Sequence, residues 1–178
     1  MRKIQKILNK GDDFMERIMV RDWGLDFDFA ALMVREDTDT IVLHHTGSGA
    51  ADDFSARELH EAHQAQGWLG VGYHYSVRRD GVIELGRPRW AVGAHAEGEN
   101  SHTLGVHLCG NFCVAEPTAA QIEAAALLLA NLAGDYAISL DRAHICGHCD
   151  LMPTACPGGK LYDALPLLIG KAIWYGEH

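Results

Sequence analysis

The chain has 178 residues, which predicts one domain, and its 48% apolar and 22% charged residues are ordinary for a globular protein. This composition excludes disordered, collagen-like and coiled-coil chains. There are 24 acidic against 15 basic residues, a net charge of −9, and no basic run is longer than a pair. Because nucleic-acid binding depends on neutralising phosphates, we expect no nucleic-acid partner.

Residues 1–39 have mixed charge and no motif that we can assign, so we treat them as an N-terminal extension of unknown role. Within this segment Ile4, Ile7 and Leu8 fit one face of a short helix, which we expect to dock on the domain surface. The basic start lacks a following apolar segment, so we expect no cleavable signal peptide and synthesis in the cytoplasm. A membrane-spanning helix needs about 20 mainly apolar residues, so we expect no stable membrane insertion.

The first strong element is the apolar segment 40–45 (TIVLHH), which predicts a buried central strand. A helix should follow from Ser55 to about Gln66. At its start the side chains of Ser55 and Glu58 are spaced as a capping box, in which each accepts a hydrogen bond from the other residue's backbone amide. Gly67 is a typical stop signal for this helix.

A β-hairpin is expected next in the chain. Asp80-Gly81 is a strong two-residue turn signal, and the β-rich segments 73–79 and 82–87 flank it. Residues 104–109 are then predicted to form another core strand.

Thr118 and Gln121 form a second capping box, which opens a helix rich in Ala and Leu that should run to about Leu132. Residues 143–146 are a candidate for a short strand. A loop containing Pro and Gly follows, and then a helix from Leu161 to about Ile169.

These elements predict a single α/β domain over residues 40–170, with a central mixed β-sheet flanked by helices. No repeat or Pro/Gly-rich linker indicates a second domain, and residues 171–178 are left as a C-terminal tail. The five cysteines are an odd number in a chain for which we expect no export signal. A disulfide framework is therefore not expected.

Histidine and cysteine are the unusual part of the composition, with 11 and 5 residues. His44 and His45 end the first core strand, and residues 147–157 contain His148 and Cys156. Zinc prefers imidazole nitrogen and thiolate sulfur, and a catalytic site uses three protein ligands and leaves one position for water. Neighbouring side chains of a strand point to opposite faces, so only one of the two strand histidines should face a metal. The alternation does not say which one.

Several motifs follow one another in a characteristic order over about residues 40–168: Ile41–Thr46, Gln66–Tyr75, Arg79–Gly81, Val92–Ala96 with Asn100, Gly105–Leu108 and Gly147–Gly158. In this order and spacing they resemble the type 2 N-acetylmuramoyl-L-alanine amidases, a family that includes phage lysozyme-amidases and peptidoglycan recognition proteins. The resemblance implies the fold of that family.

The resemblance also implies a site for one catalytic zinc ion. Carried over residue by residue, the ligands are His44, His148 and Cys156, and Tyr73 falls on the family's catalytic tyrosine. Thr154 falls where relatives carry either Lys or Thr, so this site lacks the cationic partner of the Lys-type enzymes.

The implied reaction is hydrolysis of the amide bond between the lactyl group of muramic acid and L-alanine in peptidoglycan. Zinc would activate water at neutral pH, and zinc, Tyr73 and Thr154 would stabilise the oxyanion. The alternative role for Tyr73 is to position the water. His95 and Asn100, in a Gly-containing loop, are expected to bind the muropeptide, and the alternative is that they stabilise the loop. The expected role is that of a phage or prophage endolysin acting on the cell wall. The alternatives are a cytosolic muropeptide-recycling amidase and a non-catalytic peptidoglycan-binding module.

Two further interpretations concern the cysteines. Cys146-Gly147-His148-Cys149 has the spacing of a thiol-disulfide oxidoreductase, but Pro153 would end the helix that such a motif should open. Alternatively, His144, Cys146, Cys149 and Cys156 would form a closed structural zinc site. The amidase interpretation predicts that zinc depends on His44 and not on Cys146.

Overall fold

The structure is a computed structural model that describes residues 4–6, as backbone, and residues 18–178. Its elements in chain order are β1 (Ile4–Lys6), β2 (Met19–Arg21), β3 (Thr40–His45), α1 (Ala56–Ala65), β4 (Tyr75–Val77), β5 (Ile83–Leu85), β6 (Thr103–Leu108), α2 (Ala119–Tyr136), β7 (Ile145–Gly147), the 3₁₀ helix η1 (His148–Asp150) and α3 (Gly159–Glu177).

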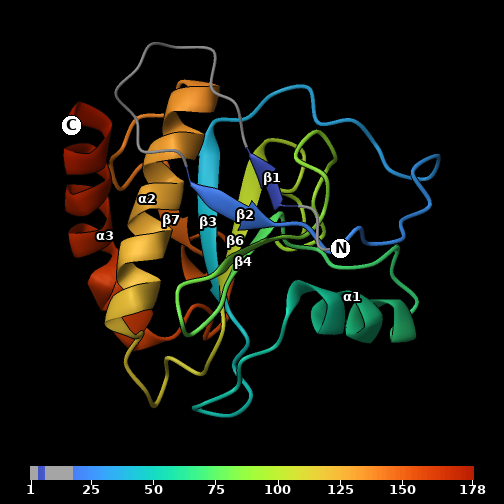
Figure 1. The fold of residues 1–178 in the computed structure, drawn as a ribbon, viewed down its shortest axis with the longest axis horizontal. Helices are drawn as coiled ribbons and strands as arrows, with labels where there is room; N and C mark the ends of the chain where they lie inside the picture. The colour runs from blue at the N-terminus through green and yellow to red at the C-terminus, as the bar shows by residue number, and fades with distance from the viewer. Residues whose placement is uncertain (1–3, 7–17) are drawn as a thin grey trace.

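The strands of the described residues form one mixed sheet in the order β1-β2-β5-β4-β6-β3-β7 (Figure 1). The strands β4, β6, β3 and β7 run parallel, whereas β5 is antiparallel to β4 and β1 is antiparallel to β2. Strand β3 therefore has a parallel neighbour on each side, and residues 41–45 are buried, as their apolar sequence predicts. The carboxyl ends of β3 and its neighbours meet at one edge, the usual place for ligands in such sheets.

The helices form a layer on each side of the sheet. Figure 1 shows α2 and α3 side by side on one face and α1 on the other. The larger core lies between the sheet and the α2–α3 pair, and it includes the fully buried Leu43, Leu104, Leu129 and Leu165. The predicted α/β domain with a mixed sheet flanked by helices is thus confirmed.

Both predicted capping boxes are present. Ser55 caps α1 together with Glu58, and Thr118 caps α2 together with Gln121. These interactions satisfy backbone amides that a helix start otherwise leaves without partners, which is why the sequence marks both starts correctly.

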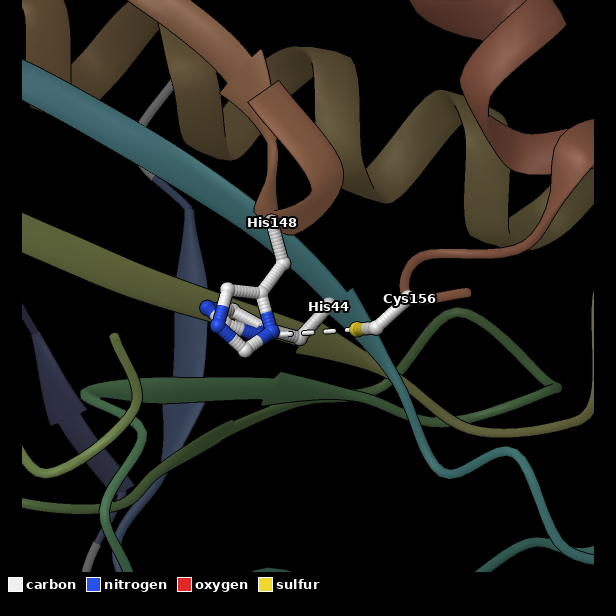
Figure 2. Close-up of side chains that lie close together, drawn as sticks. All are labelled: His44, His148 and Cys156. Carbon is white, nitrogen blue, oxygen red and sulfur yellow. Dashed lines mark hydrogen bonds between the residues drawn. The ribbon is translucent and has the colours of Figure 1, made fainter. Parts of the chain in front are cut away.

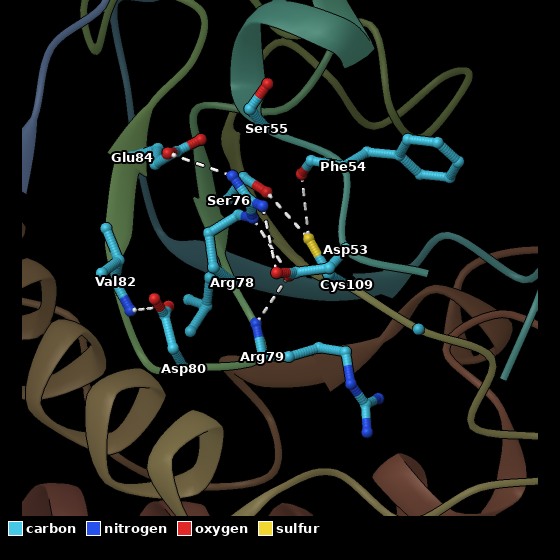
Figure 3. Close-up of polar contacts among 12 residues, drawn as sticks. Asp53, Phe54, Ser55, Ser76, Arg78, Arg79, Asp80, Val82, Glu84 and Cys109 are labelled. Atoms are coloured by element: carbon cyan, nitrogen blue, oxygen red, sulfur yellow. Dashed lines mark hydrogen bonds and ion pairs between the residues drawn. The ribbon is translucent and has the colours of Figure 1, made fainter. Parts of the chain in front are cut away.

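The predicted hairpin joins β4 to β5 through Asp80 and Gly81, and Gly81 takes the positive φ of +86° that glycine tolerates. Beside it lies the fully buried Glu84, which pairs with Arg21 and Arg78 and accepts a hydrogen bond from the Ala56 amide at 2.7 Å. Figure 3 shows the pair between Glu84 and Arg78. Together with the bond from the Ala56 amide, Glu84 ties the hairpin to the start of α1.

Two expectations need correction. Residues 4–6 form strand β1 instead of part of a surface helix, because they pair in an antiparallel register with β2 at the edge of the sheet; Ile7 and Leu8 lie outside the described residues. Helix α3 does not end near Ile169 but continues to Glu177, so most of the expected tail is helical. Contacts from Lys171 and Tyr175 to Glu123 of α2 hold this last part in place.

The segment before residue 40 belongs to the same sheet and core. Strand β2 pairs with β5, and Ile18 and Val20 are buried in the larger core. No helix in the described part of the chain has the length and apolar character needed to cross a bilayer.

Candidate metal centre and cleft

His44 and His45 end strand β3, and their side chains lie in different surroundings. His45 Nδ1 accepts a hydrogen bond from the Phe112 backbone amide at 3.1 Å, which makes it a histidine of the core. His44 instead lies beside His148 and Cys156 (Figure 2). The structure thus decides which histidine reaches the site, a choice that strand alternation leaves open.

His148 and Cys156 come from the segment after β7, the other parallel neighbour of β3. His148 is the first residue of η1, and the loop after it folds back so that the Cys149 amide donates a hydrogen bond to the Cys156 carbonyl oxygen at 2.8 Å. The ligand atoms of His44, His148 and Cys156 all lie within 4.8 Å of one another.

The chemistry of these three side chains fits a zinc ion. Nε2 of His148 is buried and has no hydrogen-bond partner among the described residues, which costs free energy unless a ligand satisfies the atom. Burial and the nearby His95 keep the pKa of His44 well below its ordinary value, so the imidazole is neutral and able to coordinate. Burial raises the pKa of the Cys156 thiol to about 12, so a bound cation is needed to hold the thiolate at neutral pH.

His95 supports His44 from the side opposite Cys156. Its Nδ1 lies 3.0 Å from His44 Nε2, while His44 Nδ1 lies 3.6 Å from Cys156 Sγ. His44 can therefore offer Nδ1 to a metal and donate its Nε2 proton to His95, an arrangement that fixes the tautomer of a ligand. Glycine backbone lies close to the His95 ring, because a Cβ at Gly93 or Gly105 would lie 2.5 or 2.6 Å from it.

Asn100 shapes the loop that carries His95. Its Oδ1 accepts hydrogen bonds from the backbone amides of His95 and Ala96 at 2.8 and 2.9 Å. Asn100 also lines the cleft beside the three candidate ligands. Its amide oxygen therefore holds the loop.

Tyr73 precedes β4 and lies against His44, with ring centroids 5.1 Å apart. Burial and the nearby Cys156 raise the pKa of its hydroxyl far above the ordinary value, so the hydroxyl keeps its proton at neutral pH. Thr154 is exposed, and its Oγ1 accepts a hydrogen bond from the Cys156 amide at 3.2 Å. That bond stabilises the turn that presents Cys156.

A cleft of about 430 Å³ opens next to the three candidate ligands. It is lined by Trp68, Tyr73, Ala94, His95, Ala96, Glu97, Asn100, His148 and Met152. Trp68, Glu97 and Met152 had no predicted role. A tryptophan directly after the helix stop Gly67 is a weak sequence signal for Trp68, whereas nothing in a single sequence indicates the other two.

The two cysteine-based alternatives find no support in the geometry. Cys146 lies within strand β7 instead of at a helix start, and burial raises the pKa values of the Cys146 and Cys149 thiols, whereas a redox thiol needs a lowered one. His144 pairs with Asp141. Of the four residues in the structural zinc interpretation, only Cys156 belongs to the candidate metal group found among the described residues.

Comparison with known proteins agrees with this geometry. Residues 34–159 match the N-acetylmuramoyl-L-alanine amidase family. The chain is 40% identical to an endolysin of Klebsiella phage KP32 over 132 residues. This match covers 71% of this chain and 85% of the endolysin. It is 35% identical over 133 residues to an N-acetylmuramoyl-L-alanine amidase of Homo sapiens, which covers 70% of this chain and 23% of that protein.

Solved structures of amidases and peptidoglycan recognition proteins share this fold. The endolysin amidase LysCS from Clostridium intestinale superposes with a TM-score of 0.75 at 29% identity, covering 84% of this chain and 93% of that one. A mutant of Drosophila PGRP-LB in complex with tracheal cytotoxin superposes with a TM-score of 0.67 at 26% identity, covering 76% and 84%. The chain therefore belongs to the N-acetylmuramoyl-L-alanine amidase family, and it is an amidase.

Proposed function

We propose that this protein is a zinc-dependent endolysin that hydrolyses the amide bond between the lactyl group of muramic acid and L-alanine in peptidoglycan. The observation that carries the proposal is the convergence of the ligand atoms of His44, His148 and Cys156 within 4.8 Å, beside an open cleft that His148 lines. The phage endolysins among its relatives support the biological role, and the cell wall would then be its place of action.

His44, His148 and Cys156 would hold the zinc ion. When bound, the ion supplies a Lewis acid that activates water and polarises the scissile carbonyl group. Three protein ligands leave a position for solvent, as catalytic zinc sites require.

The chain's own residues then orient and stabilise the reacting groups. The Tyr73 hydroxyl remains protonated, so it would donate a hydrogen bond to the carbonyl oxygen as negative charge develops there. Removing one such donor costs roughly 3–4 kcal/mol in known cases. Thr154 would add a second hydroxyl if its side chain turned from the Cys156 amide toward substrate.

Substrate binding would involve the loop of His95 and Asn100. The apolar surfaces of Trp68 and Met152 line the same cleft. The complex of the PGRP-LB mutant with tracheal cytotoxin supports a muropeptide as the kind of ligand that this fold accepts.

Mass spectrometry of purified muropeptides tests the proposal. We expect the digest to contain free glycan and intact stem peptide, with the products lost after chelation and restored by zinc. Cleavage within the peptide or between sugars would contradict the proposed bond. Binding without cleavage would instead indicate a recognition module, and lysis of cells when the protein is expressed together with a membrane-disrupting holin would separate the endolysin role from muropeptide recycling.

A further inference from the structure

The position of the Tyr73 hydroxyl depends on how the ring is held. Among the described residues, no hydrogen bond is made to this hydroxyl, so packing of the ring sets its position. Tyr73 packs against the smaller core cluster, which includes Val71 and Ala91, and it makes three contacts with other rings. The flattest of these contacts is a stack on His107, with ring centroids 4.9 Å apart and an interplanar angle of 20°. The contacts with His44 and His63 are tilted by 48° and 55°.

His107 is well placed to serve as this platform. It lies on β6 in register with His44 on β3, and in-register residues of neighbouring strands project to the same face. The ring is fully buried, and both of its nitrogens are in hydrogen bonds: Nε2 with Thr46 Oγ1 at 2.9 Å and Nδ1 with Ser76 Oγ at 2.8 Å. Tyr73 therefore lies over a ring that hydrogen bonds hold at both of its nitrogens.

An assignment exists that satisfies every group of this network. In it the Gly110 amide donates to Thr46 Oγ1 at 3.3 Å, the Thr46 hydroxyl donates to His107 Nε2, and His107 Nδ1 donates to Ser76 Oγ. Ser76 continues to Cys109 Sγ at 3.8 Å, and Cys109 donates to the carbonyl oxygen of Phe54.

Figure 3 shows the end of this network that links Ser76, Cys109 and Phe54. Both nitrogens of His107 have a hydrogen-bond partner, so the network holds the ring in one orientation. Burial lowers the pKa of His107 to about 3, which is consistent with a neutral ring.

We propose that His107 is a positioning residue that fixes the Tyr73 ring by stacking and so holds the Tyr73 hydroxyl in line with the reacting carbonyl group. This inference rests on the proposed function of Tyr73. His107 does not line the cleft, so its effect should fall on turnover and not on substrate binding.

Two variants separate the stack from the hydrogen bonds. His107→Phe and His107→Leu both lose the bonds to Thr46 and Ser76, but only His107→Phe keeps a flat ring. Each is made in the wild-type chain and in a Tyr73→Phe chain. We measure kcat and KM on a purified muropeptide, bound zinc per chain, and the thermal unfolding midpoint.

We expect His107→Leu to lower kcat by about tenfold with little change in KM, and His107→Phe to stay within about threefold of wild type. Zinc content should remain one per chain in both. In the Tyr73→Phe chain, where no hydroxyl is left to position, His107→Leu should change kcat by less than about twofold.

Other results would overturn the inference. Equal losses in His107→Phe and His107→Leu would assign the effect to the hydrogen bonds, and an undiminished loss in the Tyr73→Phe chain would show a general structural effect. If Tyr73→Phe alone left kcat unchanged, the proposed role of Tyr73 would fail and the inference with it. Failure of the wild-type protein to cleave the lactyl–alanine bond would separately refute the proposed function.

Discussion

The close approach of Gly105 to His95 makes a sharp prediction about zinc affinity. In a Gly105→Ala variant the new Cβ would lie 2.6 Å from Cγ and Cδ2 of His95, whereas ordinary contacts begin at 3.4 Å, so the ring must retreat by about 0.8 Å. A shift of that size away from His44 would stretch the 3.0 Å contact between His95 Nδ1 and His44 Nε2 to about 3.8 Å, beyond hydrogen-bond range.

The magnitude follows from the loss of this support. Removing a partner that orients a metal ligand lowers metal affinity by about 10–100-fold. Inserting a methyl group into a packed site also costs about 1–3 kcal/mol of unfolding free energy. We therefore expect Gly105→Ala to fold with reduced stability and to bind zinc about 10–100-fold more weakly.

Zinc titration in competition with a chromogenic chelator measures the affinity, and urea unfolding of the metal-free protein measures the stability. Gly176→Ala is the matched control, because a Cβ at Gly176 would have no neighbour within 4 Å. If folded Gly105→Ala bound zinc as tightly as wild type and the control, the argument that His95 supports His44 would be refuted.

Three further predictions concern stability and the cysteines. Glu84→Gln should lower the unfolding free energy in urea by about 1–2 kcal/mol, because it replaces charge-assisted hydrogen bonds to Arg21 and Arg78 by neutral ones while Arg78 keeps its pair with Asp53; an unchanged unfolding free energy would contradict this. Burial and the neighbouring Arg35 hold the pKa of His74 well below its ordinary value, so the unfolded chain binds a proton that the folded chain does not. The unfolding free energy of the metal-free protein should therefore fall as pH decreases below about 6.5, with a slope about 1.4 kcal/mol per pH unit steeper than in His74→Gln; equal slopes would contradict it. Cys146→Ser should retain one zinc per chain and full turnover, and loss of zinc would revive the structural-site interpretation.

Local signals in the sequence predicted much of the fold. The capping boxes at Ser55 and Thr118 and the turn at Asp80-Gly81 depend on residues close together in the chain, and the structure contains all three. The end of α3 and the strand at residues 4–6 depend on contacts with distant segments, which a single sequence does not display.

The candidate site, like the fold, was predicted only in part from the sequence. Residue types and spacing made the strand histidines, His148 and Cys156 candidates, but the choice of His44, His148 and Cys156 as a ligand set came from the resemblance to a family. The structure brings these three side chains together and places His45 against Phe112. The stack of His107 on Tyr73 depends on the register between β3 and β6, so only the structure reveals it.

X-ray absorption at the zinc edge tests the central claim most directly. The purified protein should bind one zinc ion with one sulfur ligand at about 2.3 Å and two imidazole nitrogens at about 2.0 Å, the remaining position being a light atom from solvent. Cys156→Ser should lose the sulfur contribution, whereas Cys146→Ser should keep it. A shell of several sulfurs, or one without sulfur, would contradict a centre built from His44, His148 and Cys156.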